Sequence, residues 1–181
     1  MMKIKHVVLF FIVTLQIGCV VFPVTRTYFE PNIEDGRPTR SSSCGYNRTA
    51  DDSLERDSDG LHIQVSPSYQ PGSPVSVTIL FQGSVGDMDL QPEQFELHSV
   101  SDGSIYKPSD ISRNVYRPDK SHPYHSIWIH ITYPVVSEKL QGIKFVFPNG
   151  SIMRNGVSIN MNPFRFNKVT KSDLYYGSIN C

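Results

Sequence analysis

The clearest evidence for the fold is the alternating segment Ile127-Trp128-Ile129-His130-Ile131-Thr132-Tyr133. Its isoleucines and its tyrosine alternate strictly with Trp128, His130 and Thr132. Because successive side chains of a β-strand point to opposite faces, this alternation predicts a strand with one buried face and one outward face.

Similar segments lie on both sides of this stretch. Leu61-His62-Ile63-Gln64-Val65 and Val75-Ser76-Val77-Thr78-Ile79 alternate in the same way, and Tyr69-Gln70-Pro71-Gly72 separates them. Proline fixes φ and glycine supplies a positive φ, so this tetrapeptide predicts a type II turn. Shorter candidate strands begin or lie at residues 95–97, 143–147, 157–161 and 174–179. Since no window has a helical stripe, we predict an all-β fold: an antiparallel, immunoglobulin-like β-sandwich of about seven to eight strands.

Residues 1–19 have the layout of a secretory signal peptide. A basic start precedes a short apolar core, and Gly18 and Cys19 place small residues near a plausible cleavage bond. The apolar run is too short to span a bilayer. We therefore expect a secreted, extracellular protein without a membrane span. Lipidation of Cys19 is the alternative, although Gln16 replaces the usual aliphatic residue of a lipobox.

The segment that follows the expected signal peptide lacks the alternation of the predicted strands. Residues 20–43 contain Pro23, Pro31, Pro38 and a run of serines without sustained periodicity, which predicts an extended leader. Residues 49–60 are polar and acidic, which predicts a loop. The sandwich domain is then expected over residues 44–181.

Composition excludes some partners. The 181 residues suit one domain with a real core, and 17 Lys and Arg residues balance 17 Asp and Glu residues. This near-neutral charge gives no reason to expect binding to nucleic acid or to an anionic membrane.

The cysteines and two sequons agree with export. Loss of Cys19 with the signal peptide leaves Cys44 and Cys181, and an even pair in an oxidising compartment predicts one disulfide. A free C-terminal thiol that pairs between chains is the alternative. Asn47-Arg48-Thr49 and Asn149-Gly150-Ser151 predict N-glycosylation.

The order of these motifs resembles the reeler domain, the N-terminal module of reelin and F-spondin that also occurs alone in secreted insect defence proteins. The matching positions are Cys44, residues 61–65, Tyr69 to Gly72 with residues 75–79, Phe95-Glu96-Leu97 with Asp102-Gly103-Ser104, Tyr133-Pro134, Gly142-Ile143-Lys144-Phe145 and Cys181. The resemblance implies an immunoglobulin-like sandwich with an extracellular recognition role, of the innate-defence or matrix-associated type. The family usually has four cysteines in two bridges, and here the two middle ones are missing. With this fold, Cys44 and Cys181 are expected to pair with each other, unlike the usual connectivity.

Aromatic residues suggest a binding face. Trp128, Tyr116 and Tyr124 lie close in sequence to Arg117, and flat rings beside hydrogen-bond donors suit stacking on sugars or packing against a protein. The alternative is that some of these rings belong to the core and the others to ordinary loops.

Three histidines lie within a short span. His122, His125 and His130 supply imidazoles that can bind Zn²⁺ or Cu²⁺, but no thiolate or well-spaced carboxylate completes a tetrahedral site. The alternative is a solvated loop followed by a strand histidine.

The chain lacks the Gly-x-Ser-x-Gly elbow of many hydrolases and has no free cysteine nucleophile if Cys44 and Cys181 are bridged. We therefore expect no enzyme and no cofactor. The sequence favours a monomeric, secreted recognition module that binds an extracellular polysaccharide or a cell-surface protein. The alternatives are an effector that engages a host or receptor protein through residues 113–130, and a metal-dependent activity at the three histidines.

Overall fold

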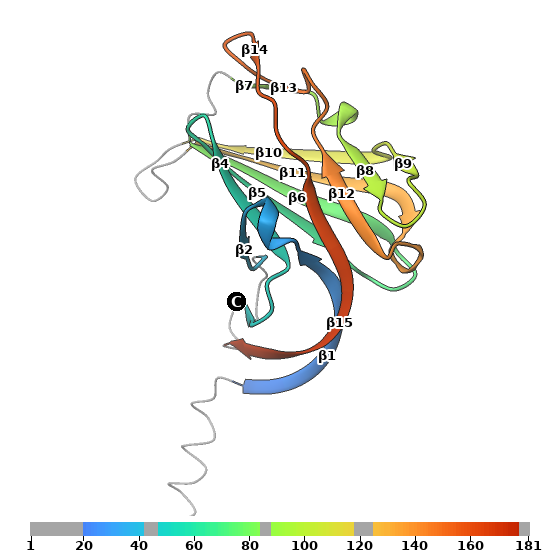
Figure 1. Ribbon diagram of the computed structural model, residues 1–181. Helices are drawn as coiled ribbons and strands as arrows, with labels where there is room; N and C mark the ends of the chain where they lie inside the picture. Colours follow the sequence, from blue (N-terminus) through green and yellow to red (C-terminus); the bar gives the residue numbers. More distant parts are fainter. Residues whose placement is uncertain (1–19, 42–46, 84–87, 118–124, 178–181) are drawn as a thin grey trace, which may run out of the picture.

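The computed structural model describes residues 20–41, 47–83, 88–117 and 125–177, which form two antiparallel sheets packed face to face (Figure 1). The first, called here the β6 sheet, has the order β10–β11–β6–β5–β4–β2. Its strands are β2 (Arg37–Thr39), β4 (Ser53–Ser58), β5 (Leu61–Ser68), β6 (Pro74–Gly83), β10 (Asp110–Tyr116) and β11 (His125–Val136).

The second sheet, called here the β15 sheet, has the order β1–β15–β12–β8–β9, and β3 also pairs with β15. Its strands are β1 (Val20–Pro31), β3 (Asn47–Arg48), β8 (Glu96–Ser99), β9 (Ile105–Tyr106), β12 (Gly142–Val146) and β15 (Phe164–Gly177). These two sheets confirm the predicted antiparallel sandwich.

A small third sheet and three short turns complete the described chain. The order β14–β13–β7 joins β7 (Met88–Leu90), β13 (Ile152–Arg154) and β14 (Val157–Ser158). The 3-10 turns are η1 (Ile33–Asp35), η2 (Pro92–Gln94) and η3 (Ser137–Lys139). In the part of the chain that the structure describes, no helix is long and apolar enough to cross a membrane.

The predicted alternation defines the core. Ile129 of β11 lies directly opposite Ile79 of β6, which lies opposite Val65 of β5, and all three are fully buried. Phe145 of β12 and Phe166 of β15 are buried in the same core from the other sheet. Side chains that alternate with these residues therefore lie on the outward face of the β6 sheet.

The predicted turn between β5 and β6 is present. The amide of Ser73 donates to the carbonyl of Gln70 at 3.1 Å, and Gly72 has a φ of 72°. Pro71 occupies the preceding turn position, so this is the type II geometry that the sequence indicates.

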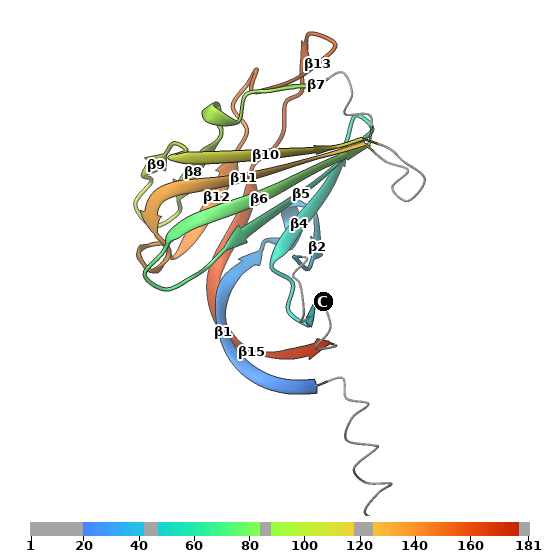
Figure 2. The ribbon, with the colours of Figure 1, turned by 180° about the vertical axis from the view of Figure 1, so that it is seen from behind.

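Residues 20–43 are not a separate leader. Val20–Pro31 forms β1, which pairs with β15 along its whole length, and Arg37–Thr39 joins the β6 sheet as β2. The prolines obscured this strand, but a strand at the end of a sheet tolerates proline because its outer N–H groups need no partner. Together β1 and β15 form a curved two-stranded ribbon that extends beyond the sandwich (Figure 2).

Part of the polar segment 49–60 is also a strand. Ser53–Ser58 forms β4, which pairs with β5 on one side and with β2 on the other. Leu54 supplies its one fully buried apolar side chain, and the charged residues that follow are partly or fully exposed. A single apolar position is too weak a signal for a sequence pattern to identify.

Candidate binding cleft

A polar wall covers the outward face of the β6 sheet. It consists of side chains that alternate with the core residues along three neighbouring strands: Gln64, Ser66, Ser76, Thr78, Trp128 and His130. We call this set the strand wall. Hydroxyl, amide and imidazole groups dominate it, so the strand wall offers both donors and acceptors to a ligand.

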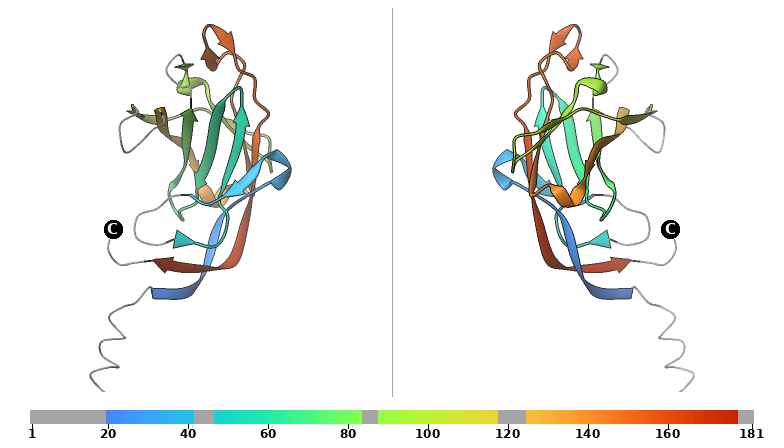
Figure 3. Two further views of the ribbon diagram at one scale, coloured as in Figure 1. Left: turned by 90° about the vertical axis from the view of Figure 1, so that its left-hand side faces the viewer. Right: turned by 90° about the vertical axis from the view of Figure 1, so that its right-hand side faces the viewer.

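The curved ribbon faces this wall and encloses a cleft of about 610 Å³. Thr25, Arg26, Thr27 and Tyr28 of β1 line it together with Tyr175 of β15. The other lining residues outside the strand wall are Ser41, Arg48, Asp52, Pro67, Ser68, Tyr69 and Pro71. Figure 3 shows the ribbon bending beneath the strands of the sandwich. The volume lies within the range of about 300–1,000 Å³ that is typical of ligand sites.

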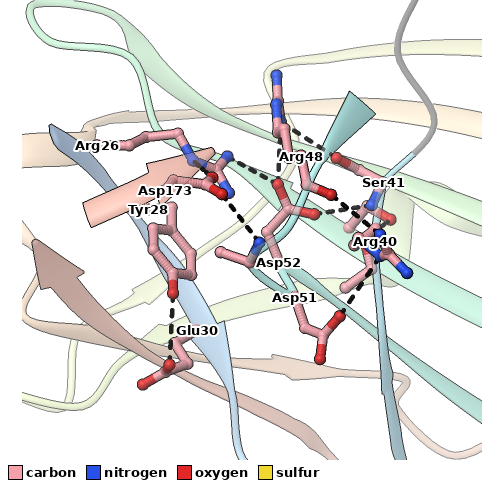
Figure 4. A network of polar contacts seen from close by, with 12 residues as sticks. Arg26, Tyr28, Glu30, Arg40, Ser41, Arg48, Asp51, Asp52 and Asp173 are labelled. Atoms are coloured by element: carbon pink, nitrogen blue, oxygen red, sulfur yellow. Dashed lines mark hydrogen bonds and ion pairs between the residues drawn. The ribbon is translucent and has the colours of Figure 1, made fainter. Parts of the chain in front are cut away.

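A network of buried ion pairs joins the ribbon to β4 (Figure 4). Arg26 donates through Nη1 to Asp52 Oδ2 at 2.8 Å, and its Nε lies 3.0 Å from Asp173 Oδ2. Arg48 donates through Nη1 to the same oxygen of Asp52 at 2.9 Å. The Asp52 and Asp173 side chains are 5% and 0% exposed, so these charges are largely removed from water.

Backbone and hydroxyl donors bond to the Oδ1 atom of each of these carboxylates, whereas Asp173 Oδ2 is buried without a hydrogen-bond partner among the described residues. Asp173 Oδ1 accepts from the Thr49 amide at 3.0 Å, from the Thr49 hydroxyl at 2.8 Å and from the Ala50 amide at 3.0 Å. Asp52 Oδ1 accepts from the Ser41 amide at 2.7 Å. Burial raises the pKa of Asp173, but these hydrogen bonds and the Arg26 charge outweigh it and hold the pKa below its ordinary value.

Aromatic rings surround the cleft. The Arg26 guanidinium lies over the Tyr28 ring, 4.4 Å from its centre, and the Tyr28 hydroxyl donates to Glu30 at 3.4 Å. Burial raises the pKa of Tyr28, and the Glu30 carboxylate raises it further. Tyr69 packs edge-on against the buried Phe29 ring, with 5.9 Å between ring centres.

Trp128 lies on the strand wall. It is partly buried, opposite Leu80 of β6 and Asn114 of β10, and it is not part of the apolar core. Two residues further along β11, His130 is exposed, and its Nδ1 lies 3.1 Å from the Thr78 hydroxyl. The indole therefore presents a flat apolar surface beside polar neighbours.

The other predicted binding residues lie elsewhere. Tyr116 is exposed at the end of β10, on the same face as Trp128 but not in the cleft lining, and Arg117 is exposed directly after it. Tyr124 lies outside the described residues. The structure thus places Trp128 and Tyr116 on one face of the β6 sheet, and of these two only Trp128 lines the cleft.

The two described histidines of the predicted metal site do not point toward one another. His125 and His130 occupy β11 an odd number of residues apart, so their side chains point to opposite faces of the strand. His122 lies outside the described residues. Within the described ranges, no group of three His, Cys, Asp or Glu side chains is close enough to hold a metal ion. The site of three histidines stays a prediction.

The predicted modification sites are only partly described. Cys44 and Cys181 both lie outside the described residues. Asn47 begins β3, opposite Tyr176 of β15. Asn149 is exposed, and its side-chain oxygen accepts from the Ser158 hydroxyl at 2.8 Å.

Sequence reasoning missed the ion-pair network. Arg26 fell in the predicted leader, and Asp52 in an acidic run that was expected to be solvated, yet Asp52 is buried. Asp173 precedes the segment expected as a last edge strand. Residues so far apart in sequence carry no local signal for their contact.

Comparison of the chain with models of known protein families, with curated proteins and with solved structures finds no match. The resemblance to the reeler domain therefore stays a prediction.

Proposed function

We propose that this protein is a secreted recognition module that binds a polysaccharide in the cleft, without turning it over. The observation that carries the proposal is the partly buried Trp128 ring on a wall of hydroxyl, amide and imidazole groups. Sugars combine apolar ring faces with a rim of hydroxyls, so they suit an indole platform beside such groups.

The cleft favours binding over catalysis. Asp52, the carboxylate among the lining residues, accepts from Arg26, Arg48 and the Ser41 amide. The lowered pKa of Asp173, which is paired with Arg26 outside the lining, keeps that group ionised near neutral pH. General acid catalysis needs a carboxyl group whose pKa is raised toward the working pH. Asp173 has the opposite property, which supports a role in holding the ribbon.

The extracellular setting of the proposal rests on the sequence. A signal-peptide-like start at residues 1–19, two sequons and an even pair of remaining cysteines support export. The resemblance to the reeler domain supports a recognition role.

Substitution of Trp128 tests the proposal. Trp128→Ala is expected to weaken polysaccharide binding by about 1–3 kcal/mol, or about 5- to 150-fold, because the stacking surface is lost. Calorimetric titration of the secreted protein with soluble polysaccharides measures the change. Tyr116→Ala is the matched control: it removes an aromatic ring from the same outward face but outside the cleft, and it is expected to leave binding unchanged.

Engagement of a protein partner through residues 113–130 is the second candidate function. It is favoured by β10, which pairs on one side with β11 and lies at the end of its sheet with Val115 and Tyr116 about half exposed. Edge strands are common docking sites for other chains. Loss of binding to a cell-surface protein in Tyr116→Ala, with Trp128→Ala unaffected, would support this candidate and contradict the cleft.

A further inference from the structure

Arg26, Arg48 and Asp52 line the cleft, and a fourth charged side chain, the buried Asp173, is paired with Arg26 outside the lining. Arg26 and Arg48 carry two positive charges, and Asp52 and Asp173 carry two negative charges, all within one connected set of ion pairs. The formal sum is zero. The field that this set presents to a ligand is therefore weak, although arginines line the cleft.

The guanidinium of Arg26 has few N–H groups available to bind an anion. Its Nη1 donates to Asp52 and its Nε lies 3.0 Å from Asp173 Oδ2, but Nε and Nη2 are both buried without a hydrogen-bond partner among the described residues. Arginine binds carboxylates and sulfates most strongly through two parallel N–H groups. No such fork of Arg26 is exposed.

Arg48 is also engaged. Its Nη1 donates to Asp52 at 2.9 Å and to the Ser41 hydroxyl at 3.3 Å, and the guanidinium lies 5.9 Å from the centre of the Tyr175 ring. A carboxylate or sulfate brought to Arg48 would approach the Asp52 carboxylate as well. That repulsion offsets the attraction of the guanidinium.

The other side of the cleft carries no fixed charge. The strand wall consists of Gln64, Ser66, Ser76, Thr78, Trp128 and His130, and it contains no Asp, Glu, Lys or Arg side chain. From these charges we infer that the ligand is an uncharged polysaccharide, recognised by ring stacking and hydroxyl hydrogen bonds. This inference rests on the proposed function and names its ligand class.

Matched neutral and anionic probes test the inference. A soluble β-glucan, a mannan and a xylan are titrated beside their carboxymethylated derivatives at about pH 8, where imidazoles are mostly neutral. Each titration is repeated between about 0.05 and 0.5 M NaCl, because salt screens exposed charges. Wild type, Trp128→Ala and Tyr116→Ala are compared.

We expect an uncharged probe to bind at least about fivefold more tightly than its carboxymethylated form, with less than a twofold change across the salt series. Trp128→Ala should abolish or weaken this binding, and Tyr116→Ala should not. Tighter, salt-sensitive binding of a carboxymethylated probe, still lost in Trp128→Ala, would overturn the ligand class and leave the cleft in place. If none of the probes binds, the proposed function fails, and the inference fails with it.

Discussion

Trp128 and Ile129 are neighbours in sequence with opposite environments. Ile129 is fully buried between the two sheets, whereas Trp128 lies partly exposed on the outward face of the same strand. A β-strand turns each successive side chain to the other face, so one position along β11 separates a core residue from the residue that we propose binds the ligand.

Substitutions at these two positions should therefore differ in their effect on stability. Ile129→Ala removes a fully buried side chain and is expected to lower the free energy of unfolding by about 2–5 kcal/mol. Trp128→Ala is expected to lower it by no more than about 1 kcal/mol, because the indole is outside the core. Urea unfolding of both variants measures the difference, and equal losses would place the indole in the core.

At the scale of elements, the curved β1–β15 ribbon depends on polar contacts. Arg26 of β1 and Asp173 of β15 meet Asp52, just before β4, and Arg48 of β3. The ribbon also positions Thr25, Thr27 and Tyr28 along the cleft. The ion pairs thus connect the stability of the ribbon to the shape of the candidate site.

Asp173→Asn should destabilise the protein by about 1.5–3 kcal/mol near neutral pH, because a charged hydrogen-bond acceptor becomes neutral in a buried site. Asp51→Asn is the control: the Asp51 side chain is 48% exposed and lies 3.9 Å from Arg40. Its effect should stay within about 1 kcal/mol.

The stabilisation by Asp173 should disappear in acid. The folded-state pKa of Asp173 lies below the unfolded value of about 4, so its contribution is complete above about pH 4 and is lost as the pH falls through the folded-state pKa. The difference in unfolding free energy between wild type and Asp173→Asn should therefore shrink below about pH 4. Urea unfolding at several pH values measures it. A difference that stayed constant would contradict an ionised Asp173.

At the scale of the whole molecule, distant parts of the chain meet at β3 and β15. Arg48 lies opposite Tyr175, and Asn47 lies opposite Tyr176. Cys44 precedes Asn47, and Cys181 follows Tyr176, by only a few residues each. Both cysteines lie outside the described residues, so a bridge between them stays a prediction from the sequence.

An even pair of cysteines remains if Cys19 is lost with a signal peptide, so the sequence predicts a disulfide between Cys44 and Cys181. Digestion without reduction, followed by mass mapping, should yield one peptide pair joined through these residues. In the chain-entropy model, closing so long a loop stabilises the fold by about 4–5 kcal/mol. Two thiols that alkylate freely, or a dimer that separates on reduction, would contradict the intramolecular bridge.

The amino-acid sequence alone predicts the strands that have one buried face and one outward face. The alternation at residues 61–65, 75–79 and 127–133 predicts which side chains enter the core and places Trp128 and His130 on the outward face. The period of two is a local property of a strand, so it can be read from neighbouring residues alone.

The segments that face the outward surface of the β6 sheet can be identified only from the tertiary structure. The pairing of β1 with β15 joins segments near opposite ends of the chain, and the meeting of Arg26, Asp52 and Asp173 follows from that pairing. Neither leaves a periodic signal, because a long-range partner is selected by the packing of the whole chain. The strand wall can therefore be predicted from the local sequence, whereas the cleft depends on the long-range packing of the chain.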